Sequence, residues 1–259
     1  MFDDRDRSLV GKKGLVVGVA NRDSIAYGCA KAFKHYGAEL AITYLNDKAR
    51  PHVEPIAVEL EAPLLLPCDV QQSGQMEAVF EAIEAEWGRL DFALHSIAYA
   101  PKVDLQGRLV DSTREGFLTA MDVSCHSFIR MARHAEPLMV DGGALFTMSF
   151  YGAEKVVKNY DLMGPVKSAL ESAVRYLAYE LGPQGIRVHA ISPGPLRTRA
   201  ASGLKEFDEL LAEAARRAPA HQLASIQDVG IATASLATES ARLITGETIY
   251  IDGGFHIMG

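Results

Sequence analysis

The chain lacks most of the features that mark secreted, membrane-spanning or nucleic-acid-binding proteins. Its 3 cysteines in 259 residues form an odd, widely spaced set, which favours neither a disulfide framework nor a metal site. A formal net charge of −7 disfavours nonspecific binding to nucleic acid, because that binding needs concentrated positive charge. No apolar run approaches the roughly 20 residues of a membrane span, and the charged residues 1–7 lack the apolar core of a signal peptide. We therefore expect a cytoplasmic protein without a membrane segment or a nucleic-acid partner.

The sequence also lacks a metal-binding motif. The 8 histidines are scattered, and none belongs to a His-Glu-x-x-His or similar ligand set. His95 follows the apolar residues 92–94, a position that favours a structural role at the end of a strand. We expect no metal.

Apolar residues make up 48% of the chain, a globular composition, and they are arranged in alternating strand and helix patterns. This alternation predicts an α/β fold, Rossmann-like and doubly wound, with helices on both faces of a parallel seven-stranded sheet. No linker or repeat divides residues 1–259, so we predict a single domain. The expected strands are residues 14–20, 38–44, 64–70, 90–95, 144–149, 186–191 and 247–252, and the expected helices are 24–33, 76–87, 114–139, 160–181 and 226–237.

One segment, about 193–223, interrupts the alternation. Pro193 and Pro195 flank a glycine and prevent an immediate helix, and the apolar residues that follow from Phe207 have helical spacing. The pattern indicates a helical substrate lid over the carboxyl ends of the strands, where ligands bind in such sheets. A packed surface helix fits the pattern equally well.

A glycine turn follows the first expected strand. The common G-x-G-x-x-G spacing is absent, and the chain instead has Gly18-x5-Ser24-Ile25-Ala26-x-Gly28. Gly18 permits a tight turn, Ser24 can cap the helix, and Gly28 permits close helix–strand packing. Such a turn is the usual place for a dinucleotide pyrophosphate, although it also fits an ordinary βα connection.

Tyr160 and Lys167 are the candidate catalytic pair. Seven residues are almost two helical turns, so both side chains would leave one helix face about 10 Å apart. A nearby ammonium strengthens a phenol as a hydrogen-bond donor, which suits chemistry that builds negative charge on a substrate oxygen. Pro165 lies between them and has no backbone N–H to donate a helical hydrogen bond, which permits a kink at the start of the helix. Two other pairs, Tyr27/Lys34 and Tyr151/Lys158, have the same spacing, and only the context favours Tyr160/Lys167.

Taken together, these motifs and several others resemble one family over nearly the whole chain. The matching segments are Gly18–Ala20 with Ser24–Gly28, 68–70, 95–101, 113–117, Asn159-Tyr160-x-x-Met163-Gly164-x-x-Lys167, 187–203, Gly246-Glu247 and 252–255. They resemble the bacterial enoyl-[acyl-carrier-protein] reductases of type II fatty acid synthesis, within the short-chain dehydrogenase/reductase superfamily.

The resemblance implies an NADH-dependent reduction of trans-2-enoyl thioesters carried by acyl carrier protein, in a homo-tetramer. Tyr160 would bond the thioester oxygen, Lys167 the nicotinamide ribose, and Ala100 would touch the substrate. The residues implied to hold the cofactor are Gly18, Ser24, Ile25, Asp69, Val70, Ile97, Lys167, Leu196, Arg197, Thr198, Arg199 and Ala200.

Two positions depart from the family pattern. The family places a second tyrosine ten residues before the catalytic one, and this chain has Phe150 there, with Tyr151 beside it. We expect Phe150 to line the substrate pocket and Tyr151, the third candidate catalytic residue, to lie at its edge. After the second strand this chain has Leu45 where the family commonly has glutamine, and no arginine stands there to pair a 2′-phosphate, which favours NADH over NADPH.

Two other functions compete with this hypothesis. A reductase of ketones or of other enoyl thioesters would use the same Tyr/Lys chemistry. A non-catalytic dinucleotide-sensing module would keep the glycine turn, although such modules often lack the Tyr/Lys pair.

Overall fold

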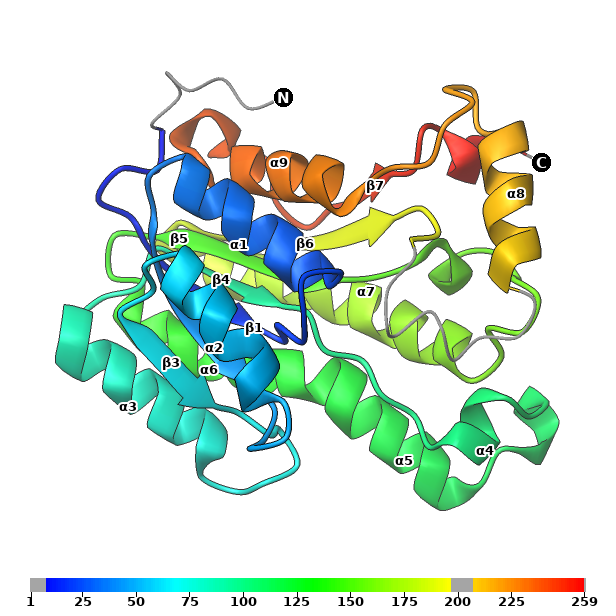
Figure 1. The fold of residues 1–259 in the computed structure, drawn as a ribbon, viewed down its shortest axis with the longest axis horizontal. Helices are drawn as coiled ribbons and strands as arrows, with labels where there is room; N and C mark the ends of the chain where they lie inside the picture. Colours follow the sequence, from blue (N-terminus) through cyan, green and yellow to red (C-terminus); the bar gives the residue numbers. More distant parts are fainter. Residues whose placement is uncertain (1–7, 197–206, 259) are drawn as a thin grey trace.

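The computed structural model describes residues 8–196 and 207–258. A single sheet of seven strands runs through the molecule in the order β3-β2-β1-β4-β5-β6-β7, and neighbouring strands pair in parallel (Figure 1). The predicted parallel seven-stranded sheet is confirmed. The strands are β1 (Lys13–Val17), β2 (Glu39–Tyr44), β3 (Leu64–Pro67), β4 (Phe92–His95), β5 (Gly143–Met148), β6 (Ile186–Pro193) and β7 (Thr248–Ile251).

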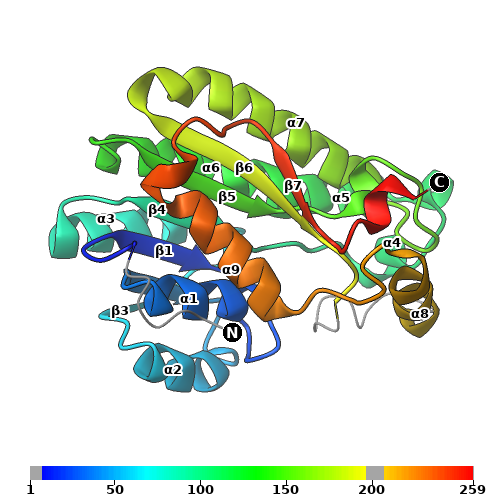
Figure 2. The same cartoon turned by 90° about the horizontal axis from the view of Figure 1, so that it is seen from above.

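Helices cover both faces of this sheet (Figure 2). Buried residues of α1, α2 and α9 pack on one face, and those of α3, α6 and α7 pack on the other. The helices are α1 (Ile25–His35), α2 (Arg50–Glu59), α3 (Gln75–Trp87), α4 (Lys102–Leu105), α5 (Arg114–Met121), α6 (Ser127–Ala135), α7 (Met163–Leu181), α8 (Phe207–Arg217) and α9 (Ile226–Ala237).

Alternate residues of each central strand belong to different cores. In β1, Val16 packs with the cluster of α1, α2 and α9, whereas Leu15 and Val17 pack with the cluster of α3, α6 and α7. Successive strand side chains point to opposite faces, so a strand covered on both faces must be apolar throughout. The short apolar runs in the sequence therefore identified interior strands.

Gly28 permits close packing of α1 against α9. A Cβ added to Gly28 would lie 2.2 Å from the carbonyl oxygen of Ile226, and one added to Gly230 would lie 2.3 Å from the carbonyl oxygen of Gly28. The two glycines thus let one helix backbone touch the other. The prediction of close helix–strand packing at Gly28 was wrong about the partner, which is a helix.

The prediction of the helices needs correction at two places. The long helix expected over residues 114–139 is divided into α5, a π-helical turn at Asp122–His126, α6 and a 3-10 turn at Glu136–Leu138. The helix α2 was not predicted, because its sequence carries Pro51 in the first turn and Pro55 inside the helix.

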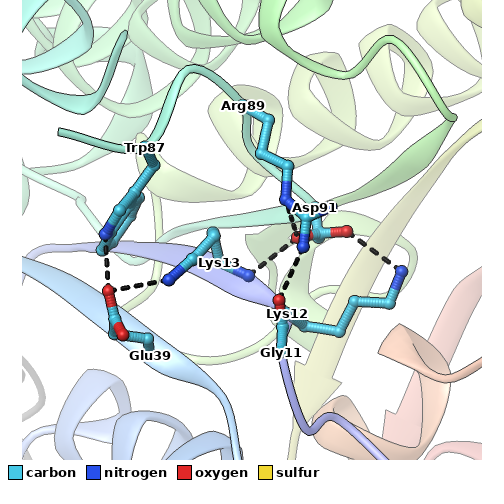
Figure 3. A network of polar contacts seen from close by, with 7 residues as sticks. All are labelled: Gly11, Lys12, Lys13, Glu39, Trp87, Arg89 and Asp91. Atoms are coloured by element: carbon cyan, nitrogen blue, oxygen red, sulfur yellow. Dashed lines mark hydrogen bonds and ion pairs between the residues drawn. The ribbon is translucent and has the colours of Figure 1, made fainter. Parts of the chain in front are cut away.

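A polar network joins the amino ends of β1, β2 and β4, opposite to the edge at which these strands end (Figure 3). Asp91 accepts hydrogen bonds from the backbone N–H of Lys13 at 2.8 Å and from Nζ of Lys12 at 3.0 Å. Glu39 accepts from Nζ of Lys13 at 2.9 Å and from Nε1 of Trp87 at 2.6 Å. These contacts fix the start of β1 between its two neighbours.

Replacing Asp91 with alanine should destabilise the fold without weakening cofactor binding. The carboxylate is 13% exposed, and its loss leaves the N–H of Lys13 without its acceptor, so we expect a cost of about 1–3 kcal/mol. Urea unfolding measures the change, with exposed Asp141→Ala as the control. Equal midpoints for the two variants would show that the network adds no net stability.

Candidate active site

A buried ammonium lies at the carboxyl end of β5. Lys167, in the second turn of α7, is 4% exposed, and its Nζ donates a hydrogen bond to the carbonyl oxygen of Met148 at 2.6 Å. Met148 is the last residue of β5. The bond therefore ties the first half of α7 to the edge of the sheet where ligands bind in this class of fold.

Tyr160 lies in a turn before α7. Asn159 and Asp161 on either side have φ of 63° and 32°, which an α-helix does not contain. The expectation that Tyr160 and Lys167 share a helix face is therefore wrong, because the helix begins only at Met163. Pro165 falls in the first helical turn, where its missing N–H costs no helical hydrogen bond, and so the helix start accommodates it.

The ring of Tyr160 is held between Phe150 and the backbone of Gly152. The Phe150 and Tyr160 ring centroids are 4.8 Å apart at an interplanar angle of 59°. A Cβ added to Gly152 would lie 2.4 Å from Cδ1 of Tyr160. A glycine is therefore required at position 152, because the ring of Tyr160 comes so close to the backbone. The sequence did not indicate this requirement.

Tyr151 points elsewhere. Its ring lies 5.6 Å from that of Phe255 at 64°, beside the buried Ala214 and Ala218 at the end of α8. The ring of Phe150 therefore contacts Tyr160, while that of Tyr151 contacts the C-terminal segment. Phe150 has an extended backbone and Tyr151 begins a 3-10 turn, Tyr151–Ala153, so the chain changes direction between the two side chains.

The environment shifts the pKa values of both groups of the pair. Burial lowers the pKa of Lys167 to about 8, against smaller opposing effects of Cys125 and Glu171. Burial, together with the charge of Glu171, raises the pKa of Tyr160 above its ordinary value. At neutral pH, Tyr160 is therefore a protonated phenol and Lys167 a charged ammonium, so both are hydrogen-bond donors.

The glycine turn has the geometry expected of a dinucleotide cradle. Gly18 has φ of 103°, and a Cβ added there would lie 2.2 Å from the carbonyl oxygen of Ser96. Ser24 caps α1 by accepting from the N–H of Tyr27 at 3.3 Å, and Ile25 is the first helical residue. The N-terminus of α1 thus starts at the carboxyl edge of β1, where helix dipole and backbone N–H groups favour a phosphate.

The other cofactor candidates surround this edge of the sheet. Asp69 and Val70 follow β3, and the N–H of Asp69 donates to Oε1 of Gln75 at 2.7 Å. Ile97 follows β4 and packs on the cluster of α3, α6 and α7. Leu196 follows β6 and is 9% exposed. Sequence positions far apart are therefore brought to the ends of β1, β3, β4 and β6.

The substrate candidate Ala100 lies in an apolar cluster that the Tyr160 ring also contacts. It is 5% exposed and belongs to a small apolar cluster that includes Leu162, Val166 and, at its edge, Tyr160. A separate cavity of about 410 Å³ is bordered by Arg22 and Leu196 together with residues of α8 and α9. Arg197, Thr198, Arg199 and Ala200, which we also expected at the cofactor, lie outside the described residues.

Sequence reasoning missed one polar contact of this site. Oε1 of Glu171, one helical turn beyond Lys167, accepts a hydrogen bond from Oγ of Ser149. Ser149 is 5% exposed and directly follows Met148. An acidic residue four positions after the candidate lysine was the available signal.

Within residues 8–196 and 207–258, no cluster of three or more His, Cys, Asp or Glu side chains could hold a metal ion. None of the helices in these ranges is long and apolar enough to span a membrane.

Comparison with known proteins gives one consistent result. The family model described as "Enoyl-(Acyl carrier protein) reductase" matches residues 18–256. "Enoyl-[acyl-carrier-protein] reductase [NADH] 1" of Rhizobium meliloti is 45% identical over 249 residues, which are 96% of this chain and 92% of that protein. The corresponding Escherichia coli protein, also named as an NADH enzyme, is 44% identical over 96% of this chain and 95% of its own.

Solved structures agree with these sequence matches. The Anaplasma phagocytophilum enoyl-(acyl-carrier-protein) reductase, solved in complex with NAD, has a TM-score of 0.93 at 45% identity and covers 97% of this chain and 96% of its own. The Aquifex aeolicus NADH enzyme has a TM-score of 0.93 at 46% identity, with 97% and 99% coverage. The Bacillus cereus enzyme, solved with NADP+ and an indole naphthyridinone, has a TM-score of 0.95 at 42% identity, with 97% and 99% coverage.

Lys167 should titrate near pH 8 in the free protein, against about 10.4 for an ordinary lysine, because its ammonium is buried. The pH dependence of acetylation of each lysine, followed by mass spectrometry, measures this value, and exposed lysines of the same chain provide the reference. A titration of Lys167 that coincides with that of the exposed lysines would contradict the burial of its charge.

Proposed function

Because the chain belongs to the enoyl-[acyl-carrier-protein] reductase family, we propose that Tyr160 and Lys167 are the polar groups of its NADH-dependent reaction. The enzyme reduces the carbon–carbon double bond of enoyl thioesters in fatty acid biosynthesis. The observation that supports the assignment most directly is the buried ammonium of Lys167 at the carboxyl end of β5, next in sequence to Val166, whose apolar cluster the Tyr160 ring contacts.

Bound NADH supplies the hydride that the β-carbon of the enoyl chain accepts. We propose that Gly18, Ser24 and Ile25 hold the pyrophosphate and ribose, that Asp69 and Val70 hold the adenine, and that Ile97 and residues 196–200 contact the nicotinamide end. The tight turn at Gly18 and the capped start of α1 support this assignment, because they form an anion-binding helix terminus next to β1.

Tyr160 stabilises the charge that hydride addition creates. When the β-carbon accepts hydride, negative charge develops on the thioester oxygen as an enolate, and the α-carbon subsequently takes up a proton. The pKa of Tyr160 is raised by burial, so its hydroxyl stays protonated and donates a hydrogen bond to that oxygen. The contact with Phe150 and the lack of a side chain at Gly152 keep the phenol in place.

Lys167 serves the cofactor and the phenol together. Its ammonium has three donor hydrogens, one of which goes to the carbonyl of Met148, so others are available to the ribose hydroxyls of the nicotinamide nucleoside. Its positive charge also favours negative charge on the substrate oxygen beside Tyr160.

Phe150 and Tyr151 are proposed to have different roles. Phe150 lines the acyl pocket next to Tyr160 with an apolar ring that cannot bond the thioester oxygen. Tyr151, the third candidate catalytic residue, contacts Phe255, which supports a packing or gating role at the edge of the pocket, beside α8. The segment 193–223 that contains α8 is the proposed substrate lid.

The substrate is carried by acyl carrier protein, and we propose a homo-tetrameric assembly in the cytoplasm. Exposed apolar side chains on helices of one sheet face support an interface between copies of the chain, with Phe117 and Leu118 on α5, Ile129 on α6, and Tyr176 and Tyr179 on α7.

All 3 cysteines are free and buried, which fits a reducing compartment. We propose that residues 1–259 act as a single domain.

Tyr160→Phe and Lys167→Ala should separate catalysis from cofactor binding. Loss of the hydroxyl removes a donor to the developing charge, so we expect Tyr160→Phe to lower kcat about 100-fold or more with NADH affinity nearly unchanged. Lys167→Ala should also weaken NADH binding roughly tenfold or more, because a charged donor is lost. Crotonyl-thioester reduction and fluorescence titration with NADH measure these effects.

Two outcomes would count against this division of roles. Equal changes in NADH affinity for both variants would refute it. Faster reduction of a ketoacyl thioester than of crotonyl thioester by the unmodified protein would reject the assigned reaction.

Gly152→Ala should impair catalysis through Tyr160 alone. The added methyl would lie 2.4 Å from Cδ1 of Tyr160, so the ring must move, and we expect kcat to fall roughly tenfold to a hundredfold. Gly182→Ala is the matched control, because nothing lies within 4 Å of the Cβ that it would add. Normal turnover in Gly152→Ala would mean that the position of the phenol tolerates this displacement.

A further inference from the structure

The end of β5 is held by a carboxylate on α7. The backbone N–H of Ser149 donates to the carbonyl oxygen of Ile191 at 2.7 Å, and its hydroxyl donates to Oε1 of Glu171 at 2.5 Å. Glu171 therefore joins α7 to the end of β5.

Ser149 stands between the two residues that contact the catalytic pair. Met148 before it supplies the carbonyl that accepts from Lys167, and Phe150 after it packs its ring on Tyr160. A hydrogen bond that fixes Ser149 therefore fixes the acceptor of the ammonium and the ring beside the phenol together. Glu171 is also four residues after Lys167 on α7, where side chains are neighbours on one face.

The groups that face the ammonium of Lys167 differ in charge. Cys125, from the π-helical turn, has a thiol whose pKa is raised by burial, so it is neutral at pH 7. His95 of β4 has its pKa lowered to about 3 by burial, and it is neutral as well. Against the larger effect of burial, Cys125 and, to a smaller extent, Glu171, an acid on the same helix face, raise the pKa of Lys167.

Burial raises the pKa of Glu171 above its ordinary value, and the hydrogen bond from Ser149 and the charge of Arg175 oppose this effect only in part. Burial and the neighbouring Glu154, and to a smaller extent Glu171, raise the pKa of Tyr250, which donates a hydrogen bond to Oε2 of Glu154 at 2.7 Å.

We propose that Glu171 is a positioning residue of the active site, which fixes the end of β5 through Ser149 and supplies the countercharge of the buried Lys167 ammonium. This role rests on the proposed function only in that Lys167 serves catalysis, because the contacts themselves exist in the free protein. The residue touches neither of the two catalytic side chains by a direct hydrogen bond and acts through their supports.

Glu171→Gln tests the proposal, because glutamine keeps an oxygen acceptor for Ser149 and removes the charge. The apparent pKa of Lys167, measured by acetylation and mass spectrometry in the free protein, should fall by roughly one unit. The alkaline limb of the kcat profile for crotonyl-thioester reduction should move to lower pH by a similar amount. Glu180→Gln, an exposed acid on the same helix, is the matched control and should move neither quantity.

Ser149→Ala separates the hydrogen bond from the charge. It leaves the carboxylate in place, so we expect kcat to fall several-fold. The pKa of Lys167 in this variant should be closer to its value in the unmodified protein than to its value in Glu171→Gln.

A Lys167 pKa in Glu171→Gln equal to that in Glu180→Gln, with circular dichroism showing both folded, would overturn the proposal. If the unmodified protein failed to reduce enoyl thioesters but the pKa shift occurred, the proposed function would fail and the role of Glu171 as counterion would stand.

Discussion

The arrangement of the site depends on one buried charge, the ammonium of Lys167, and on its hydrogen bond to the carbonyl of Met148. A buried ammonium is costly unless it is bonded and compensated, so its surroundings are constrained. The bond fixes α7 against the end of β5, and the same strand end carries Ser149 and Phe150 toward Glu171 and Tyr160. The helix, the strand end and the turn that bears the phenol are therefore positioned as one unit.

Close backbone approaches complete this unit. Gly18 brings the turn after β1 against the loop after β4, and Gly152 accepts the ring of Tyr160. Gly28 and Gly230 bring α1 and α9 into backbone contact, which places the start of α1 beside the carboxyl edge of the sheet. In each case a methyl group would occupy space already filled by a carbonyl or a ring. The glycine turn after β1 and the ring of Tyr160 can therefore take their positions only because Gly18 and Gly152 have no side chain.

The two edges of the sheet have different roles. At the amino ends of β1, β2 and β4, Asp91 and Glu39 hold neighbouring strands in register through hydrogen bonds and ion pairs. At the carboxyl ends lie the glycine turn and the candidate pair Lys167 and Tyr160. The turn that contains Asn159 and Asp161 and the buried ammonium of Lys167 both destabilise the fold locally. The polar contacts at the amino edge of the sheet offset part of this cost.

The sequence alone determined the parallel sheet, most of its strands and helices and the family, because apolar periodicity and the motif residues are local properties; the assignment of the Tyr/Lys pair stays a prediction. It could not determine that Tyr160 precedes the helix, since the positive φ values of Asn159 and Asp161 depend on the packing of the turn. It did not indicate α2, where prolines contradict a helix that tertiary contacts stabilise, or the π-helical turn at Asp122–His126. Phe150 and Tyr151 contact different partners, Tyr160 and Phe255, because a 3-10 turn begins at Tyr151, and strand alternation in the sequence did not indicate that turn. Only the tertiary structure brought Ser149 and Glu171 together, because a hydrogen bond between separate elements leaves no periodic signal in the sequence.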